Sequence, residues 1–180
     1  MNQSNSLVSW AIDPVHSRIR FDTRYLLITA VSGWFREIEG TVSSPEAGFS
    51  GCEIALTIYT DSLYTGVQDR DNHLRSADFF DTGRYPTVQF RSTKVLGSDD
   101  SRLTVAGKLI IKGIELEIQF NAKFLGEASD PVGNVKAGFE ADILLDRKDF
   151  NITWNQFFDQ NGILISDQVN LHADIQLLRL

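Results

Sequence analysis

The sequence predicts an all-β domain made of antiparallel strands, together with one short helix. Apolar residues recur at every second position through most of the chain, and turn-forming residues separate these runs. A period of two is typical of strands that bury one face, and short turns between such strands favour antiparallel pairing. The length of 180 residues fits a single domain, which we expect over residues 9–180 behind a flexible N-terminus at residues 1–8.

The predicted strands follow one another along the chain. The clearest lies at residues 115–124, where Leu116, Ile118 and Phe120 form one apolar face and the residues between them are polar. The same alternation predicts further strands at residues 17–25, 54–58, 88–92, 103–111, 139–145 and 171–177.

Residues 65–76 break the alternation and favour a short helix. Asp69 and His73 are four positions apart, as are Asp71 and Arg75, and side chains at this spacing share one helix face. Clusters of Gly, Pro, Asn, Asp and Ser predict turns between the strands. These clusters lie at residues 40–51, 97–101, 111–113 and 130–134.

About eight strands can form either a sandwich or a closed barrel, and periodicity alone does not separate the two. Strand length favours the barrel. Strands as long as 17–25 and 115–124 would need wide, flat sheets in a sandwich, whereas tilted barrel strands reach such lengths and leave no exposed edge. An eight-stranded barrel is wide enough either to pack its own side chains or to hold one ligand.

Charge argues against one class of partner. The chain has 17 Lys and Arg against 24 Asp and Glu, which gives a formal net charge of −7. Nucleic-acid binding depends on clustered cations that neutralise phosphates, so we expect no nucleic-acid partner.

Apolar runs and cysteine content bear on location. Residues 1–10 contain no Lys or Arg and no long apolar run, so the sequence predicts no signal peptide. No run approaches the roughly 18 apolar residues of a transmembrane segment. Cys52 is the only cysteine, which suits a reducing compartment. We expect a cytoplasmic protein for the chain as given, and a periplasmic one if a leader was removed.

No motif in the chain predicts a catalytic residue, a metal site or a cofactor. His16, His73 and His172 are far apart, without the close spacing of a zinc pair. The acidic run that begins at Asp69 resembles a calcium loop, but Leu74 stands where such a loop requires Gly. Cys52 has no nearby His and is expected to be a small core residue.

Ordered motifs over nearly all of residues 9–178 resemble the YceI-like polyisoprenoid-binding family. The most specific block is residues 70–90, which contains Arg70-Asp71-Asn72-His73-Leu74 and ends in Tyr85-Pro86-Thr87-Val88-Gln89-Phe90. Further matching motifs lie at residues 10–21, 31–35, 107–113, 130–134, 137–139, 146–150, 153–155 and 162–169.

The resemblance implies a lipocalin-like, eight-stranded antiparallel barrel with an elongated apolar pocket. It implies a bacterial binding protein without enzymatic activity, whose ligand is a polyisoprenoid or an isoprenoid quinone held for transport or storage. Members of the family are often homodimers. The binding mode is consistent with the physics of burial, because each buried methylene contributes about 0.8 kcal/mol.

Inward-facing aromatic and aliphatic residues are the candidates for the lipid-tail pocket: Phe21, Tyr25, Phe35, Phe79, Phe90, Phe120, Phe139, Ile143 and Trp154. The head-group candidates are His16, His73 and Arg75, which lie in two of the matching motifs. The alternative for these polar residues is that His16, Asp71 and Arg75 tie the helix to the barrel rim. Residues 155–161 are expected to form a loop near the mouth of the pocket.

Two other functions stay open on the sequence. One is an enzyme that acts on an apolar substrate with His16 or His73 as acid or base, which requires the imidazole to face the cavity. The other is a structural module whose aromatic residues pack a solid core.

Overall fold

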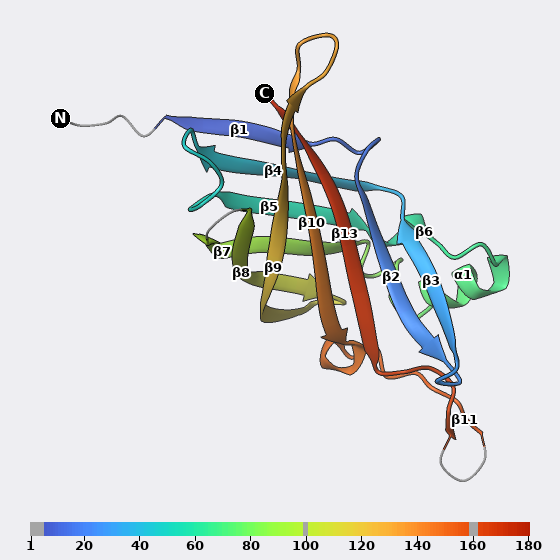
Figure 1. Ribbon diagram of the computed structural model, residues 1–180. Helices are drawn as coiled ribbons and strands as arrows, with labels where there is room; N and C mark the ends of the chain where they lie inside the picture. Colours follow the sequence, from blue (N-terminus) through green and yellow to red (C-terminus); the bar gives the residue numbers. More distant parts are fainter. Residues whose placement is uncertain (1–5, 99–100, 159–161) are drawn as a thin grey trace.

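Most of the chain forms one antiparallel sheet that closes on itself. The computed structural model describes residues 6–98, 101–158 and 162–180. Eight strands form a ring in the order β1, β4, β5, β7, β8, β9, β10, β13, and pairing of β13 with β1 closes it (Figure 1). These strands are β1 (Leu7–Ile12), β4 (Ile38–Pro45), β5 (Glu53–Tyr59), β7 (Thr87–Ser98), β8 (Arg102–Ile111), β9 (Ile114–Ser129), β10 (Val135–Asp146) and β13 (Gln168–Arg179).

A smaller flap extends the sheet on one side of β13. It consists of β2 (Arg18–Tyr25), β3 (Thr29–Phe35) and β6 (Leu63–Tyr64). β13 pairs with β1 through residues 177–179 and with β2 through residues 170–174. β1 and β2 therefore pair with two successive segments of the same edge of β13, and the chain bends between them.

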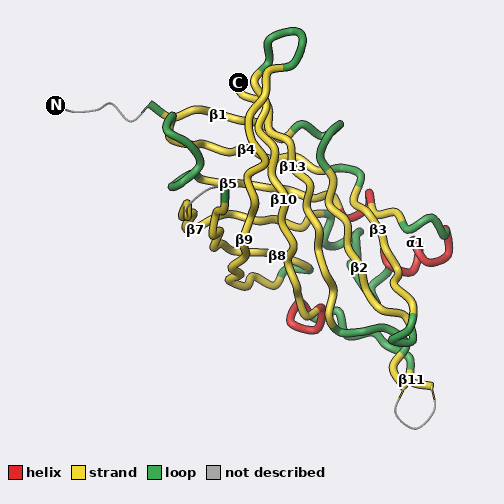
Figure 2. The backbone as a smooth tube through the Cα atoms, in the orientation of Figure 1, coloured by secondary structure: helices red, strands yellow, loops and turns green. Residues whose placement is uncertain are grey.

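Figure 2 shows that strands make up nearly the whole body, with the helical segments at its margin. The α-helix α1 (Gln68–Arg75) confirms the helix predicted at residues 65–76. Two short 3-10 helices, η1 (Thr60–Ser62) and η2 (Arg147–Phe150), lead out of β5 and β10. A short hairpin of β11 (Phe157–Phe158) and β12 (Gly162–Ile163) projects from the body.

The strands predicted from alternation are all present, and the closed ring confirms the barrel over the sandwich. Local geometry also confirms two predicted turns. Lys112 and Gly113 have φ values of 51° and 76° between the paired residues Ile111 and Ile114, which is a tight hairpin. The turn at residues 130–134 is held by the Asp130 carboxylate, which accepts hydrogen bonds from two backbone amides. The turn predicted at residues 97–101 includes residues 99–100, outside the described residues.

Two expectations differ from the structure. The segment 40–51 is not a turn throughout, because its first half belongs to β4, where small polar residues on either side of Val42 mask the alternation. The N-terminal strand β1 begins at Leu7, and Leu7 and Val8 pair with Pro45 and Ser44. Residues 7–8 are thus part of the sheet, whereas residues 1–5 lie outside the described residues.

An aromatic cluster closes one end of the barrel interior. Phe49, in the loop between β4 and β5, packs its ring against Trp10, Phe124 and Phe139 with centroid separations of 5.3, 5.5 and 4.8 Å. These rings come from β1, β9, β10 and the loop between β4 and β5. The interior between this cluster and α1 contains the candidate site.

Candidate ligand-binding cavity

Two apolar cavities lie inside the barrel and share a wall. The outer cavity has a volume of about 500 Å³ and is bounded by β2, β3, α1 and residues within 145–154 and 164–165. The inner cavity, of about 160 Å³, lies deeper, toward Phe49. Four side chains line both spaces and form the waist between them: Ile19, Ile58, Val88 and Leu171. The two cavities therefore lie next to each other, with these four side chains between them.

Side chains at every second position of the strands form the cavity walls. On β2, Ile19, Phe21, Thr23 and Tyr25 point into the outer cavity, while the residues between them face outward. On β13 the inward residues from Val169 onward continue from the outer cavity into the inner one. Because most of these inward side chains are apolar, the walls that the strands contribute are largely apolar.

The structure places every lipid-tail candidate on a cavity wall. Those of the outer cavity are Phe21, Tyr25, Phe35, Phe79 and Trp154. Those of the inner cavity are Phe90, Phe120, Phe139 and Ile143. Their contact with a ligand stays a prediction.

The three head-group candidates are not brought together. Only His73 lines the outer cavity, where its Nε2 atom lies 2.9 Å from Asp78 Oδ2 and its ring stands nearly perpendicular to that of Trp154 at 4.6 Å. Arg75, two residues away, donates hydrogen bonds to the carbonyl oxygens of Asp61 and Leu63 at 3.0 and 2.7 Å. Arg75 thus joins α1 to η1 and β6.

His16 lies elsewhere, in the bend between β1 and β2. Its Nδ1 atom is 2.8 Å from Asp13 Oδ2, and its side chain is 57% exposed. It is not among the described residues that line either cavity. The idea that Asp71 and Arg75 tie α1 to the rim fits the structure, since Asp71 accepts hydrogen bonds from the amide and hydroxyl of Thr65. His16 takes no part in that contact.

Asp13 is the centre of a cluster of hydrogen bonds that includes His16. Its carboxylate accepts hydrogen bonds from Lys136 of β10 and Gln176 of β13, at 3.1 and 2.9 Å. Partial burial would raise the pKa of Asp13, but the hydrogen bonds from His16, Lys136 and Gln176 outweigh it and hold that pKa well below its usual range. These bonds join the bend between β1 and β2 to β10 and β13.

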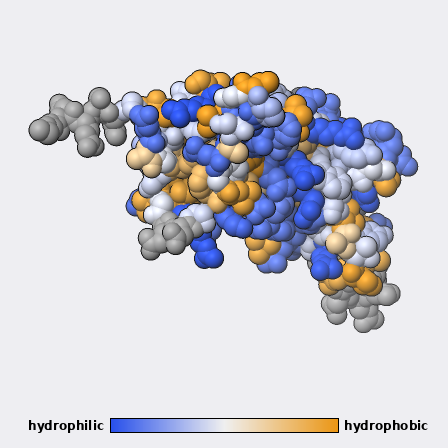
Figure 3. Space-filling view, turned by 45° about the horizontal axis from the view of Figure 1, so that its top comes forward, coloured by the Kyte–Doolittle hydropathy of each residue, from blue (hydrophilic) through white to orange (hydrophobic). Residues whose placement is uncertain are grey.

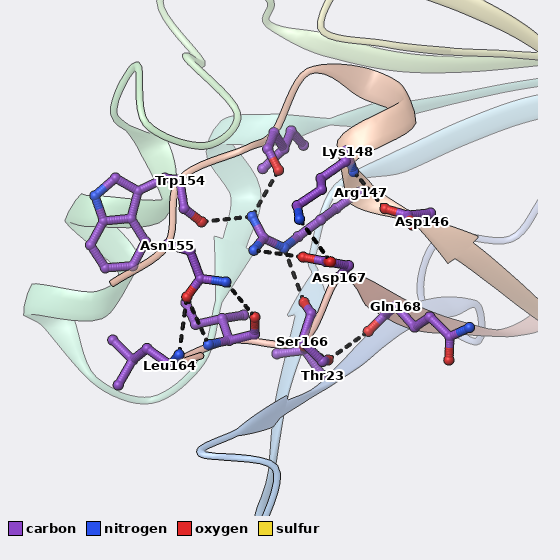
Figure 4. Close-up of polar contacts among 12 residues, drawn as sticks. Thr23, Asp146, Arg147, Lys148, Trp154, Asn155, Leu164, Ser166, Asp167 and Gln168 are labelled. Atoms are coloured by element: carbon purple, nitrogen blue, oxygen red, sulfur yellow. Dashed lines mark hydrogen bonds and ion pairs between the residues drawn. The ribbon is translucent and has the colours of Figure 1, made fainter. Parts of the chain in front are cut away.

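Arg147 is the main cavity residue that the sequence reasoning missed. Its guanidinium is buried at the wall of the outer cavity and donates to the carbonyl oxygens of Ile152, Trp154 and Ser166 at 2.7, 2.7 and 3.0 Å (Figure 4). The Oδ1 atom of Asp167 lies 3.4 Å from Nη2 of Arg147. Burial lowers the pKa of Arg147, and Asp167 opposes that shift. Arg147 lies in the family-matching motif at residues 146–150, for which the sequence predicted no role.

Asn155 completes the support of this wall. Its side-chain oxygen accepts hydrogen bonds from the amides of Leu164 and Ile165, both at 3.1 Å, and its side-chain nitrogen donates to the carbonyl of Ile165 at 2.7 Å (Figure 4). Arg147 and Asn155 therefore hold residues 152–156 as an ordered wall although this segment has little strand pairing. The result is that Trp154 stays fixed over the cavity.

Polar side chains concentrate at the edge of the outer cavity next to α1. Thr65, Asp69, Arg70 and His73 all line this edge. Arg70 donates to the hydroxyl and the carbonyl of Thr65 at 2.7 and 3.0 Å. The cavity thus has one polar edge and otherwise apolar walls, the usual pattern of a site that binds an apolar molecule with one polar group.

The fold and the cavity define a lipocalin-like barrel with an internal apolar binding space. The chain belongs to the YceI-like family, because the family model described as a YceI-like domain matches residues 10–177. It is similar to protein YceI of Escherichia coli O157:H7, with 36% identity over 137 residues that cover 76% of this chain and 71% of the relative.

Solved structures agree with this assignment. The YceI protein of Campylobacter jejuni is 28% identical, with a TM-score of 0.73 over 86% of this chain and 88% of that chain. A polyisoprenoid binding domain from Saccharophagus degradans shares 16% identity and a TM-score of 0.70, covering 96% of this chain and 99% of that chain. At that identity the likeness shows the fold alone. Within the described residues, no helix is both long and apolar enough to cross a bilayer.

Proposed function

We propose that this protein binds a long isoprenoid lipid, a polyprenyl chain or an isoprenoid quinone, without catalysis and for transport or storage. The observation that carries the proposal is the pair of adjoining apolar cavities, an outer one of about 500 Å³ and an inner one of about 160 Å³, with a waist of shared side chains between them. The family assignment and the solved structure described as a polyisoprenoid binding domain support it.

The two ends of the interior suggest how the ligand lies. The tail would pass the waist at Ile19 and Leu171 and end near Phe139, while the head group would stay at the polar edge formed by Arg70 and His73. Burial of methylenes at about 0.8 kcal/mol each would provide most of the affinity, reduced by the ordering of a flexible chain. The polar edge would then select the head group.

An enzymatic role has one specific observation in its favour, the pair of His73 and Asp78 at the cavity edge. A carboxylate that fixes an imidazole is a common arrangement in acid–base catalysis. The His73 ring also packs against Trp154 and Phe79, which fits a positioning role at the entrance. The two functions differ in the fate of the ligand, which a binder returns unchanged.

Native mass spectrometry of the freshly purified protein, followed by organic extraction, tests the proposal. We expect a stoichiometric isoprenoid that is recovered chemically unchanged, and the same spectrum tests the homodimer that the family resemblance implies. Ile143→Asp places a charge on the inner wall and should abolish lipid retention. Leu144→Asp, its exposed neighbour on the outer face of β10, is the matched control and should retain the lipid.

The proposal fails if the wild-type protein stays free of lipid after incubation with polyprenyl and quinone lipids. It also fails if folded Ile143→Asp, checked by circular dichroism, retains as much lipid as the control. Recovery of a modified lipid would instead favour the enzyme.

A further inference from the structure

Two neighbouring turns at one end of the molecule present exposed apolar side chains. Leu27 and Ile28, in the turn between β2 and β3, are 61% and 77% exposed, and Phe157 in β11 is 75% exposed. These three residues are called the apolar tip below. The β2–β3 turn and the β11 hairpin lie together at the lower right of Figure 1, and Figure 3 shows apolar surface at the corresponding end.

Backbone hydrogen bonds join the two turns into one unit. The amide of Leu26 donates to the carbonyl of Leu164 at 2.8 Å, and the amide of Ser166 donates to the carbonyl of Arg24 at 3.0 Å. Tyr25 forms an isolated β-bridge with Ile165 between these bonds. The apolar tip is therefore held on a paired backbone.

The β2–β3 turn uses residues that turn geometry disfavours. Leu26 and Leu27 have φ values of 52° and 59°, and the amide of Ile28 donates to the carbonyl of Tyr25 at 3.1 Å. A turn with two positive φ values usually contains Asn or Gly, because bulky side chains crowd the backbone there. Leu27 neither suits the turn nor packs into the core, which favours a contact outside the molecule.

The apolar tip continues directly from the cavity wall. Tyr25 and Leu164 line the outer cavity, and each is joined to the turn that carries Leu27 and Ile28. The path from the cavity to the exposed apolar end of the molecule is thus short and passes Tyr25 and Leu164. A lipid that is insoluble in water needs such a path, because it has to leave a bilayer without crossing open solvent.

We propose that the apolar tip is a bilayer-docking surface, in which Leu27, Ile28 and Phe157 insert into the outer layer of a lipid membrane and bring the cavity edge to it. This inference rests on the proposed function, since the ligand to be exchanged is the isoprenoid lipid.

Area favours a bilayer over a second copy of the chain as the occupant. Even a large aromatic side chain buries only about 150–250 Å², so three side chains fall short of the about 800 Å² per partner of a stable protein interface. A bilayer sets no such threshold, because insertion scales with the apolar area that is buried.

Charge indicates which membranes should bind. The chain carries a formal net charge of −7, and the cation at the tip is Arg24, which donates to the carbonyl of Ile28 at 3.4 Å, so we expect no strong attraction to anionic lipids. Apolar insertion would carry the binding, and we expect vesicles of phosphatidylcholine alone to suffice, with little dependence on salt.

Flotation of the unloaded protein with phosphatidylcholine vesicles tests the tip. The double variant Leu27→Ser/Ile28→Ser should bind about a hundredfold more weakly, because it removes two inserted aliphatic side chains. Val132→Ser is the matched control, since Val132 is 82% exposed in the β9–β10 turn at the opposite end. The control should float like the wild type.

A second readout keeps this inference separate from the proposed function. Loading with a fluorescent polyprenyl lipid delivered in detergent needs the cavity but no docking, and the double variant should load like the wild type. Its transfer of that lipid between phosphatidylcholine vesicles should nevertheless be slower by about the loss of vesicle binding.

Two results would overturn the docking surface. One is a wild type that loads lipid but does not float, and the other is a double variant that floats like the wild type. If that variant has also turned from a dimer into a monomer, the tip is an interface between two copies of the chain. Flotation of a wild type that loads no lipid would support the tip as a membrane contact and contradict the proposed function instead.

Discussion

Gly33 on β3 leaves the space that the ring of Phe21 on β2 occupies. The two residues are paired across the strands, and a Cβ atom built on Gly33 would overlap the tip of the Phe21 ring. The ring can therefore lie flat along the flap and form part of the outer cavity wall. A Cβ atom built on Gly107 of β8 would likewise overlap the ring of Phe90 on β7, although these two residues are diagonal neighbours and not a pair.

Gly33→Ala should displace the Phe21 ring and destabilise the protein by about 1–3 kcal/mol, the usual effect of overpacking a core. Urea unfolding measures the change in the free energy of unfolding. Gly83→Ala is the control, because a Cβ there meets no atom within 4 Å, and it should leave stability nearly unchanged. Equal stability of the two variants would show that the ring moves without penalty.

Arg147→Met should lower the free energy of unfolding by about 2–4 kcal/mol. The change leaves the carbonyl oxygens of Ile152 and Trp154 without their buried donor, and a buried unpaired polar group is costly. Fluorescence of Trp154 should also change as its segment loosens, which the unfolding experiment records in the same samples.

Lys148→Met is the matched control for Arg147. Lys148 forms a half-exposed ion pair with the same Asp167 at 2.8 Å, and such pairs contribute about 0–1 kcal/mol. If both variants lose the same stability, the wall at residues 152–156 does not depend on the buried guanidinium.

Ala173→Phe should shorten the lipid that the protein accepts. Ala173 lines the inner cavity of about 160 Å³, and a phenyl group there would fill much of the space for the end of the tail. Native mass spectrometry with a mixture of polyprenyl lipids of different lengths measures the preference. Gln119→Phe, on the exposed outer face of β9, should keep the wild-type preference. An unchanged preference in Ala173→Phe would place the tail outside the inner cavity.

Asp13→Asn should destabilise the protein by about 1–3 kcal/mol at neutral pH, since hydrogen bonds to a charged partner are lost. The folded-state pKa of Asp13 lies below its usual value. Its stabilisation is therefore complete above the unfolded-state pKa of about 3.9 and declines as the pH falls toward the folded-state value.

The difference between wild type and Asp13→Asn should accordingly be constant from about pH 5 to 7 and shrink below about pH 4. Thermal unfolding across this range checks the sign. A difference that grows with acidification would mean that the carboxylate destabilises the bend between β1 and β2.

Strands with strong alternation could be predicted from local sequence. Leu116, Ile118 and Phe120 could be assigned to one face because the period of two is a local property of the backbone. Motif order also identified the family and the aromatic residues of both cavity walls. β4 was not predicted, because the small polar residues beside Val42 give little contrast in polarity between the two faces of this strand.

Only the tertiary structure decided how distant residues meet. Ring closure joins Trp10 to Arg179, and no local pattern encodes that pairing. His16 and Arg75 looked like partners of His73, yet the fold turns Arg75 toward β6 and leaves His16 in another bend. Arg147 became a cavity residue because three carbonyls converge on it. The sequence gives the chemistry of each side chain, but which side chains share a site depends on packing between segments far apart along the chain.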